Sequence, residues 1–373
     1  MPVKILCVAG ARPNFMKLAP LIKALQQDPN FQPVLVHTGQ HYDNKMSGQF
    51  FLDLCMPTPD FNLEVGSGTH ACQTAEIMKR FEPVVLQEKP DAVLVVGDVN
   101  STVACALVAT KLQVPVIHVE AGLRSFDRTM PEEINRVVTD AISDLLLVTE
   151  ESGRLNLLAE GIPAKRIHMV GNLMIDSLRQ HVEVALRSDI CARLGMTGAA
   201  YGLVTLHRPA NVDDPAQFDE ILGAIACIAG NLPLYFPVHP RTAAQLRARG
   251  TSLDPRIRLI EPLGYLDFLC LMSQSRLVLT DSGGIQEETT VLGVPCLTLR
   301  DNTERPATIE EGTNLLAGTR KSSILAAWEQ MRRSPKIGRI PQYWDGCAAD
   351  RCVRVLRNRF PECNASLTGA NTQ

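Results

Sequence analysis

The sequence predicts an α/β protein with two doubly wound, Rossmann-like domains and a central cleft. Apolar, strand-like runs alternate with helical patterns in both halves of the chain, which is typical of parallel sheets. The length of 373 residues allows two separate cores. Ligands of such folds bind outside the carboxyl ends of the strands, so we expect an active site in the cleft, at these ends.

The sequence predicts an N-terminal domain over residues 1–175 and a C-terminal domain over 176–345. The final segment, 346–373, is expected to return toward the N-terminal domain. The predicted strands are 4–9, 33–37, 92–96, 114–119, 145–148 and 166–170, then 203–206, 234–238, 257–260, 277–279 and 294–299. A helix is predicted over 174–187, and the Gly- and Ala-rich stretch 195–202 indicates a boundary. A last helix is expected over 350–360, followed by a frayed polar tail.

The composition is that of an ordinary soluble protein, with 45% apolar and 21% charged residues. A net charge of -3 and a pI near 6.3 give no general attraction to nucleic acid, so any phosphate binding has to be local. The chain has no 18-residue apolar span and no N-terminal signal pattern. We therefore expect a cytoplasmic protein without a membrane partner.

The cysteines favour neither a disulfide framework nor a metal site. There are 11 of them, an odd number, and none are spaced Cys-x-x-Cys. Most lie in apolar stretches, for example Cys7, Cys105, Cys227 and Cys296, and are expected to be buried, reduced side chains. The 8 histidines show no zinc-protease spacing, so no metal is expected.

The stretch 281–288 carries a predicted anion site. After strand 277–279 a helix is expected over 284–292, and Ser282 would supply a capping hydroxyl at its start. Gly283 and Gly284 let a phosphate approach the free N–H groups at the positive end of the helix dipole. The glutamates at 287 and 288 are expected on the first turn, where one would accept hydrogen bonds from a ribose. The alternative is an ordinary cap and turn.

A charged loop over 300–306 follows the next predicted strand and contains two arginines. It would lie beside the predicted anion site, at the carboxyl edge of the sheet. Arg305 could then bind a phosphate with two parallel hydrogen bonds.

The first strand ends in Gly-Ala-Arg-Pro-Asn-Phe-Met-Lys, residues 10–17, which is a glycine turn before a helix. Arg12 and Lys17 place two cations near this helix start. The pattern lacks the Gly-Lys-Ser/Thr of a nucleoside-triphosphate loop. The alternative is a tight turn with two solvated cations, because the helix dipole disfavours cations at this end.

Three carboxylates stand where predicted strands meet their loops or the next helix begins. Asp98 follows Val-Val-Gly, Glu120 follows His-Val, and Glu133 opens the helix after 120–125. Each alone would more often be a cap or an ion-pair partner. Together in one cleft, like charges would raise and separate their pKa values, as acid/base chemistry requires.

From Gly10 through Arg305 these motifs resemble the non-hydrolysing UDP-N-acetylglucosamine 2-epimerases, whose fold is like that of the two-domain GT-B glycosyltransferases. The resemblance implies interconversion of UDP-GlcNAc and UDP-ManNAc, which supplies ManNAc-type precursors for surface polysaccharide. The implied route is anti-elimination of UDP to a 2-acetamidoglucal, followed by re-addition to the other face. It further implies no cofactor, a UDP-sugar as ligand and a homodimer.

The resemblance also implies roles for individual residues. Asp98, Glu120 and Glu133 would be the acid/base set, without an assignment of faces. The other implied site residues are Lys17 and His207 as catalytic residues and Arg12, Arg136, His239, Ser282, Gly283, Gly284, Glu288 and Arg305 as substrate contacts. For His207 the alternative is a packing role at the end of its strand.

Two departures from the family pattern bear on the substrate. The first loop has Ala11 and Asn14 where many members have Thr and Glu, which predicts different substituents on the sugar. Some bacterial members bind a second UDP-GlcNAc as an activator through a Gln-His pair and an arginine; Gln40 and His41 are present, but 63–70 contains no arginine. The Gly-x-Gly-x-x-Ala match at 66–71 follows no buried strand, so dinucleotide binding is not expected.

Several alternative functions share these motifs. The substrate could be a 2,3-diacetamido uronic acid, and a hydrolysing relative would release free ManNAc. A retaining glycosyltransferase would need an acceptor that no motif identifies. A sugar-nucleotide sensor without catalysis would not need three cleft carboxylates.

Overall fold

A computed structural model describes residues 1–40, 56–196, 198–250 and 253–361. The chain forms two compact units, Met1–Ser177 with Gln342–Gln373, and Leu178–Pro341. Each unit has its own parallel sheet, as the alternating pattern predicts. Among the described residues, no helix is both long and apolar enough to cross a membrane.

The first unit is built on a seven-stranded parallel sheet in the order β3-β2-β1-β4-β5-β6-β7. Its strands are β1 Val3–Ala9, β2 Phe31–His37, β3 Phe61–Asn62, β4 Ala92–Val96, β5 Val116–Ala121, β6 Leu145–Val148 and β7 Ile167–Met169. The strand order reverses between β1 and β4, which is where doubly wound sheets open a crevice at their carboxyl ends. The short edge strand β3 was not predicted, because two residues show no periodicity.

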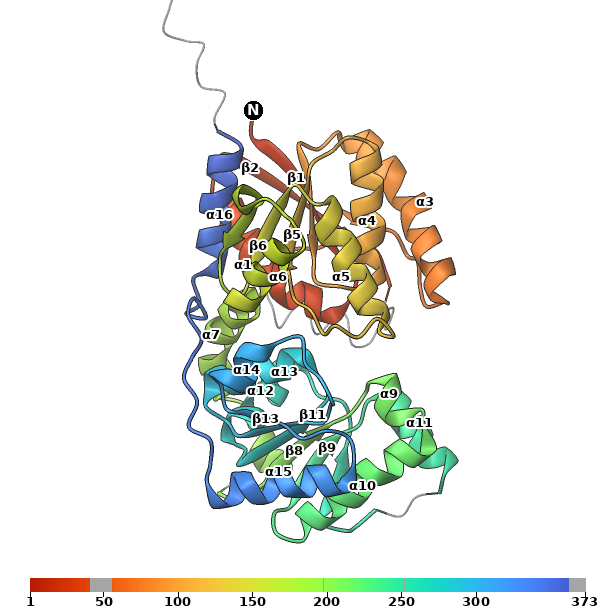
Figure 1. Ribbon diagram of the computed structural model, residues 1–373, viewed down its shortest axis with the longest axis vertical. Coiled ribbons are helices and arrows are strands. Elements are labelled where there is room, and N and C mark those ends of the chain that lie inside the picture. The colour runs from red at the N-terminus through yellow and green to blue at the C-terminus, as the bar shows by residue number, and fades with distance from the viewer. Residues whose placement is uncertain (41–55, 197, 251–252, 362–373) are drawn as a thin grey trace, which may run out of the picture. The chain divides into compact units, whose positions relative to one another are not determined.

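Helices cover both faces of this sheet. Helices α3, α4 and α5 lie side by side on one face, and α16 packs against α1 on the other (Figure 1). Their bounds are α1 Arg12–Gln26, α3 His70–Glu88, α4 Asn100–Lys111, α5 Pro131–Ile142, α6 Glu151–Ala159 and α16 Ala348–Arg359, with a 3-10 turn at Ala164–Arg166. Helix α7, Leu173–Ala185, runs from the first unit into the second.

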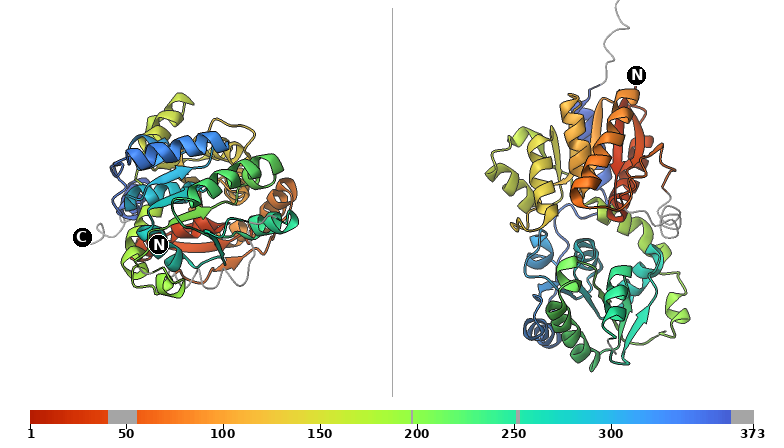
Figure 2. Two further views of the ribbon diagram at one scale, coloured as in Figure 1. Left: turned by 90° about the horizontal axis from the view of Figure 1, so that it is seen from below. Right: turned by 90° about the vertical axis from the view of Figure 1, so that its right-hand side faces the viewer.

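The second unit has a six-stranded parallel sheet in the order β10-β9-β8-β11-β12-β13. Its strands are β8 Gly202–Thr205, β9 Leu234–Pro237, β10 Ile257–Ile260, β11 Leu277–Thr280, β12 Cys296–Thr298 and β13 Asn314–Leu316. Its helices are α8 Ile190–Arg193, α9 Pro209–Val212, α10 Pro215–Ala229, α11 Pro240–Ala248, α12 Tyr265–Gln274, α13 Gly283–Leu292, α14 Pro306–Glu310 and α15 Lys321–Arg333. Two further views show the helices around each sheet (Figure 2).

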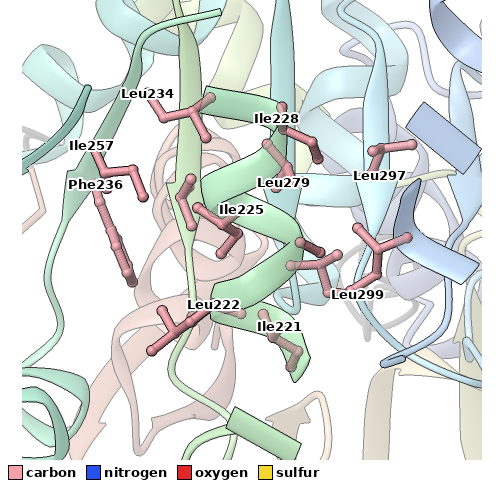
Figure 3. Packing of buried hydrophobic residues seen from close by; sticks show 14 of the residues in the cluster. Ile221, Leu222, Ile225, Ile228, Leu234, Phe236, Ile257, Leu279, Leu297 and Leu299 are labelled. Atoms are coloured by element: carbon pink, nitrogen blue, oxygen red, sulfur yellow. The ribbon is translucent and has the colours of Figure 1, made fainter. Parts of the chain in front are cut away.

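The core of the second unit forms where α10 lies on the sheet (Figure 3). Ile221, Ile225 and Ile228 recur every three to four residues and therefore share one face of the helix. They meet Leu279 of β11 and Leu297 of β12, and all five side chains are buried. Burial of each such side chain stabilises the fold by roughly 1.5–3 kcal/mol, which fixes the sheet whose carboxyl edge carries the site.

Besides β3, three details differ from the sequence predictions. The stretch 195–202 lies inside the second unit, while the chain passes between units at Ser177 and again at Pro341. Cys227 is exposed, on the outer side of α10, whereas the other three cysteines named above are buried. Strand β13 was not predicted. The predicted frayed tail lies outside the described residues after position 361.

Candidate active site

The predicted site residues stand at the carboxyl ends of strands in both units, and each group is described within its own unit. In the first unit Arg12 and Lys17 lie on α1, Asp98 follows β4, Glu120 lies in β5, and Glu133 and Arg136 lie on α5. In the second unit His207 follows β8, His239 follows β9, Ser282, Gly283, Gly284 and Glu288 lie at or in α13, and Arg305 precedes α14.

Asn14 fastens the first loop to the end of β4. Its Oδ1 accepts hydrogen bonds from the N–H groups of Gly10 (3.2 Å) and Ala11 (2.9 Å), and its Nδ2 donates to the Val96 carbonyl (3.0 Å). The side chain is buried, and the backbone takes most of its hydrogen-bonding capacity. An ionised glutamate could not donate to Val96. Asn14 therefore has a structural use here and gives no support to the predicted change in the sugar.

Lys17 and Glu120 form a buried ion pair, with 2.5 Å between Nζ and Oε2. The alternative of a solvated cation is therefore wrong for Lys17, whereas Arg12 is half-buried at the first position of α1. Gly97 lies beside the pair, since a Cβ there would stand 3.8 Å from both Lys17 Nζ and Glu120 Oε1. An ammonium and a carboxylate thus meet where β1, β4 and β5 end.

Glu120 has a strained backbone. Its φ of 69° lies in the left-handed region, which is uncommon for a residue with a side chain. The pairing of β5 with β6 shifts between Val119 and Ala121, so Glu120 is the extra residue of a bulge. Such backbone strain costs on the order of 1–3 kcal/mol and clusters at functional sites. The bulge turns this carboxylate toward Lys17.

Arg136 joins the other two carboxylates. Its guanidinium contacts Asp98 and lies 2.5 Å from Glu133 Oε2. Glu133 also accepts hydrogen bonds from the N–H groups of Ser125 (2.9 Å) and Phe126 (2.9 Å). Burial opposes ionisation of Glu133, but these hydrogen bonds and the charge of Arg136 outweigh it and hold the pKa below its ordinary value. The predicted upward shift is wrong for Glu133.

In the second unit the guanidinium of Arg305, which precedes α14, lies against the first turn of α13. A Cβ on Gly283 would overlap its guanidinium, so the glycine is required by this approach. Ser282 is the N-cap residue, but its side chain makes no capping hydrogen bond, and its N–H donates to Thr280 Oγ1 at 3.0 Å. The prediction that the Ser282 hydroxyl caps the helix is therefore wrong. The structure does bring a guanidinium to the first turn of α13, which also contains Gly284.

The two glutamates of α13 lie beyond its first turn, which contains no acidic residue. Glu287 Oε1 accepts a hydrogen bond from Arg305 Nε at 2.7 Å. Glu288 Oε1 accepts one from Tyr265 Oη at 3.0 Å. The predicted first-turn position of the two glutamates is therefore wrong. Their carboxylates also have different partners, since Glu287 binds Arg305 and Glu288 binds the hydroxyl of Tyr265.

Glu304 gathers three arginines around this helix start, a role that the sequence reading missed. Its carboxylate contacts Arg305, lies 2.6 Å from Arg300 Nη2 and 3.5 Å from Arg208 Nη2. Burial opposes its ionisation, but the charges of these three guanidiniums hold the pKa of Glu304 well below its usual range. Even with Glu287 included, the cluster keeps a net positive charge, as a diphosphate site requires.

His207 is oriented by Asp281, a second residue without a predicted role. His207 Nδ1 lies 2.9 Å from Asp281 Oδ1, and the N–H groups of His207 (3.0 Å) and Arg208 (2.9 Å) donate to Oδ2. Burial opposes ionisation, but His207 and the two backbone donors lower the pKa of Asp281 to about 2. The His207 side chain is 43% exposed, so the packing alternative is wrong. His239 caps α11, with its ring 5.9 Å from that of His207.

Within the described ranges no group of three or more His, Cys, Asp or Glu side chains is arranged to hold a metal ion. The positive charges lie on Lys17 in the first unit and on the arginines at the start of α13 in the second.

The protein family described as UDP-N-acetylglucosamine 2-epimerase matches residues 23–357. The chain is 43% identical to the UDP-N-acetylglucosamine 2-epimerase of Methanocaldococcus jannaschii, over 95% of this chain and 99% of that protein. It is 42% identical to the UDP-2,3-diacetamido-2,3-dideoxy-D-glucuronate 2-epimerase of Pseudomonas aeruginosa, with the same coverage. The crystal structure of the M. jannaschii enzyme in complex with UDP-GlcNAc and UDP superposes with a TM-score of 0.90, covering 95% of this chain and 100% of that one.

Proposed function

The chain belongs to the UDP-N-acetylglucosamine 2-epimerase family, and on this premise we propose that it interconverts UDP-GlcNAc and UDP-ManNAc. In this reaction a base removes the proton from C2 while the bond from C1 to the UDP oxygen breaks, which leaves a C1=C2 double bond. UDP then adds back to C1 and a proton arrives at C2 from the opposite face. The chemistry needs two proton-transfer groups and a site that stabilises the departing diphosphate.

The first unit supplies the proton-transfer groups in this proposal. Asp98 and Glu120 act at C2, and Lys17 is the cationic partner of Glu120. Glu133 accepts hydrogen bonds from two backbone N–H groups and pairs with Arg136, so it serves best as an ionised anchor. Through Arg136 it fixes the side chain of Asp98.

The second unit supplies the UDP site, and this assignment rests on one observation. The Arg305 guanidinium lies against the first turn of α13, inside a cluster of three arginines. The backbone N–H groups of Gly283 and Gly284, together with the Ser282 hydroxyl, which makes no capping hydrogen bond, then complete a diphosphate site. Glu288 is the proposed ribose acceptor. Arg12, His207 and His239 are further proposed substrate contacts, with His207 aimed by its buried carboxylate.

NMR of UDP-GlcNAc with the protein in D2O tests the proposal. The expected product is UDP-ManNAc with deuterium at C2, because the proton removed from one face is replaced by one from solvent. Accumulation of UDP and free ManNAc would identify a hydrolysing enzyme. A UDP-GlcNAc spectrum that keeps its C2 proton over many hours would overturn the proposal.

A second candidate substrate is UDP-2,3-diacetamido-2,3-dideoxy-glucuronate, which the similar P. aeruginosa enzyme is named for. The same elimination applies to it, since the reacting atoms C1 and C2 are unchanged. Comparison of kcat/KM for the two UDP-sugars decides between them. A ratio above about 100 in either direction corresponds to about 2.7 kcal/mol of transition-state discrimination.

We also propose that the protein is a cytoplasmic homodimer that supplies ManNAc-type precursors for surface polysaccharide. Family membership supports this proposal. Light scattering at micromolar concentration tests the dimer, and fractionation of the source cells tests the location.

A further inference from the structure

Helix α5 buries a stripe of charged side chains and exposes apolar ones. Glu133, Arg136 and Asp140 follow a spacing of three and four residues, and all are 3% exposed or less. On the other side Ile134 and Val137 are 42% and 39% exposed. Burial of charge costs several kcal/mol per ion unless each is paired, so this inverted pattern requires a use. Glu133 and Arg136 serve to hold the side chain of Asp98. The proposed reaction assigns no role to Asp140.

Asp140 is fully buried and binds three groups around the β5 loop. Its Oδ1 lies 2.6 Å from His118 Nδ1. Its Oδ2 accepts a hydrogen bond from the Gly122 N–H at 3.0 Å and lies 2.7 Å from Arg124 Nη1. Arg124 is paired in turn with Glu160 at 2.7 Å, so the buried charges are compensated.

His118 carries this link from β5 to β4. Its Nε2 lies 2.8 Å from the carbonyl oxygen of Gly97. A carbonyl only accepts hydrogen bonds, so His118 Nε2 has to donate the proton. Gly97 has a φ of 68° and directly precedes Asp98. Asp140 therefore reaches the loop of one proposed proton-transfer residue through a histidine ring.

Asp140 also fixes the chain just after the strained residue of the other loop. Gly122 is held from both sides, because Asp140 binds its N–H and Asn156 Nδ2 donates to its carbonyl at 2.9 Å. A Cβ on Gly122 would overlap the backbone of Gly153. A backbone held in the left-handed region, as Glu120 is, persists only when its surroundings determine it fully.

We propose that Asp140, acting directly on Gly122 and through His118 on Gly97, is the positioning residue that holds Asp98 and Glu120 in reactive geometry. This inference rests on the proposed epimerase function. It assigns no contact with substrate to either Asp140 or His118. It predicts that loss of the carboxylate harms turnover much more than UDP binding, which belongs to the second unit.

The test is Asp140→Asn, measured for kcat, KM, UDP affinity and thermal stability. The expected result is a fall in kcat of about 100-fold, the effect of a misplacement of about 1 Å, with KM and UDP affinity within about threefold. Asp144→Asn is the matched control, because Asp144 Oδ2 accepts the Val116 N–H (2.9 Å) at the opposite end of the same strand. The control is expected to keep its kcat within about twofold.

One further variant, His118→Gln, keeps the proposal testable if Asp140→Asn folds poorly. His118→Gln leaves Asp140 with Arg124 and Gly122 and breaks the link to Gly97 alone, so kcat should still fall at unchanged UDP affinity. When both substitutions are combined, kcat should fall little beyond the worse single variant, because both break one chain of contacts. Losses that multiply would contradict the linkage. So would an unchanged kcat in Asp140→Asn, or an equal loss in Asp144→Asn. If the native chain itself leaves UDP-GlcNAc unchanged, the proposed function fails instead.

Discussion

Replacement of Asp281 by asparagine should destabilise the carboxyl edge of the second sheet in a pH-dependent way. The buried carboxylate accepts hydrogen bonds from the His207 ring, from the His207 and Arg208 N–H groups, and from Asn211 Nδ2 at 3.3 Å. Asparagine keeps the shape, but only one of its two terminal atoms accepts. Its amino group would face a backbone N–H, leaving a buried donor unsatisfied.

The lowered pKa of Asp281 sets the magnitude of this effect. A shift from 3.8 to about 2 means that ionised Asp281 contributes about 2 kcal/mol of stability at neutral pH. Because the folded-state pKa is below the unfolded value, the unfolded chain binds more protons between these two values. The contribution is therefore fully present above pH 3.8 and is lost as the pH falls toward about 2.

Hydrogen exchange of the β8 and β11 amides measures the local free energy of opening at this edge of the sheet. A local measurement is needed because the two units need not unfold in one transition. Asp281→Asn should lower the opening free energy by about 2 kcal/mol from pH 5 to 7, with a difference that narrows below pH 4. Asp219→Asn is the control. Its carboxylate is 68% exposed and pairs with Arg249, so a change within about 1 kcal/mol is expected. Equal protection of native and Asp281→Asn protein at pH 7 would refute the reasoning.

Three more predictions concern the reaction. Glu120→Gln and Asp98→Asn should each lower kcat by about 10²–10⁴-fold with UDP affinity within a few-fold, and full turnover in both would remove them from proton transfer. Arg305→Ala should weaken UDP binding by roughly 1.5–3 kcal/mol, measured by calorimetry. Gly283→Ala should also weaken UDP binding, because the added methyl group would displace the Arg305 guanidinium. Native UDP affinity in both variants would rule out the proposed UDP site at the start of α13. UDP-ManNAc should be converted with hyperbolic kinetics and no added UDP-GlcNAc, whereas a lag abolished by trace UDP-GlcNAc would show an activator site.

The last of these predictions depends on what surrounds the 63–70 stretch. Gln40 is buried and its Oε1 accepts hydrogen bonds from the N–H (3.0 Å) and hydroxyl (2.6 Å) of Ser101. His41 lies outside the described residues. Arg80 of α3 does approach the stretch, but it donates to the carbonyls of Leu63 and Glu64 at 2.8 Å. Arg80 therefore does not replace the arginine missing from the sequence motif, because its guanidinium binds backbone carbonyls of the stretch itself.

The sequence predicts the bounds of several elements correctly. The runs 92–96, 145–148 and 257–260 match β4, β6 and β10, and Gly293 ends α13 in the left-handed conformation, with a φ of 71°. Residues directly after such runs have to stand at the carboxyl edge of a parallel sheet. This is why the positions of Asp98 and His207 could be predicted without coordinates.

The partners of those residues could not be predicted in the same way. Asp281 and His207 meet because β8 and β11 are neighbours in the sheet, although strands β9 and β10 separate them along the chain. His118 and Asp140 likewise meet only when α5 packs beside β5. Periodicity gives the face of one element and not its neighbour, so a buried carboxylate that orients a histidine looks like any other aspartate in the sequence.

The misjudged pKa of Glu133 shows where this limit affects the chemistry. Neighbouring carboxylates raise one another's pKa values only if no cation lies closer to them than they lie to one another. Whether such a cation is present depends on contacts between elements that the sequence does not show. Arg136 follows Glu133 by three residues on α5, a spacing that places both side chains on one face of a helix. Burial of that face opposes ionisation of Glu133, but it also leaves the attraction unscreened by solvent, so the Ser125 N–H and Arg136 together hold the pKa of Glu133 below its ordinary value. A carboxylate that is held ionised by a guanidinium and two backbone N–H groups is a poor proton donor near neutral pH. This supports the proposal that Glu133 anchors Arg136 and that Asp98 and Glu120 transfer the proton.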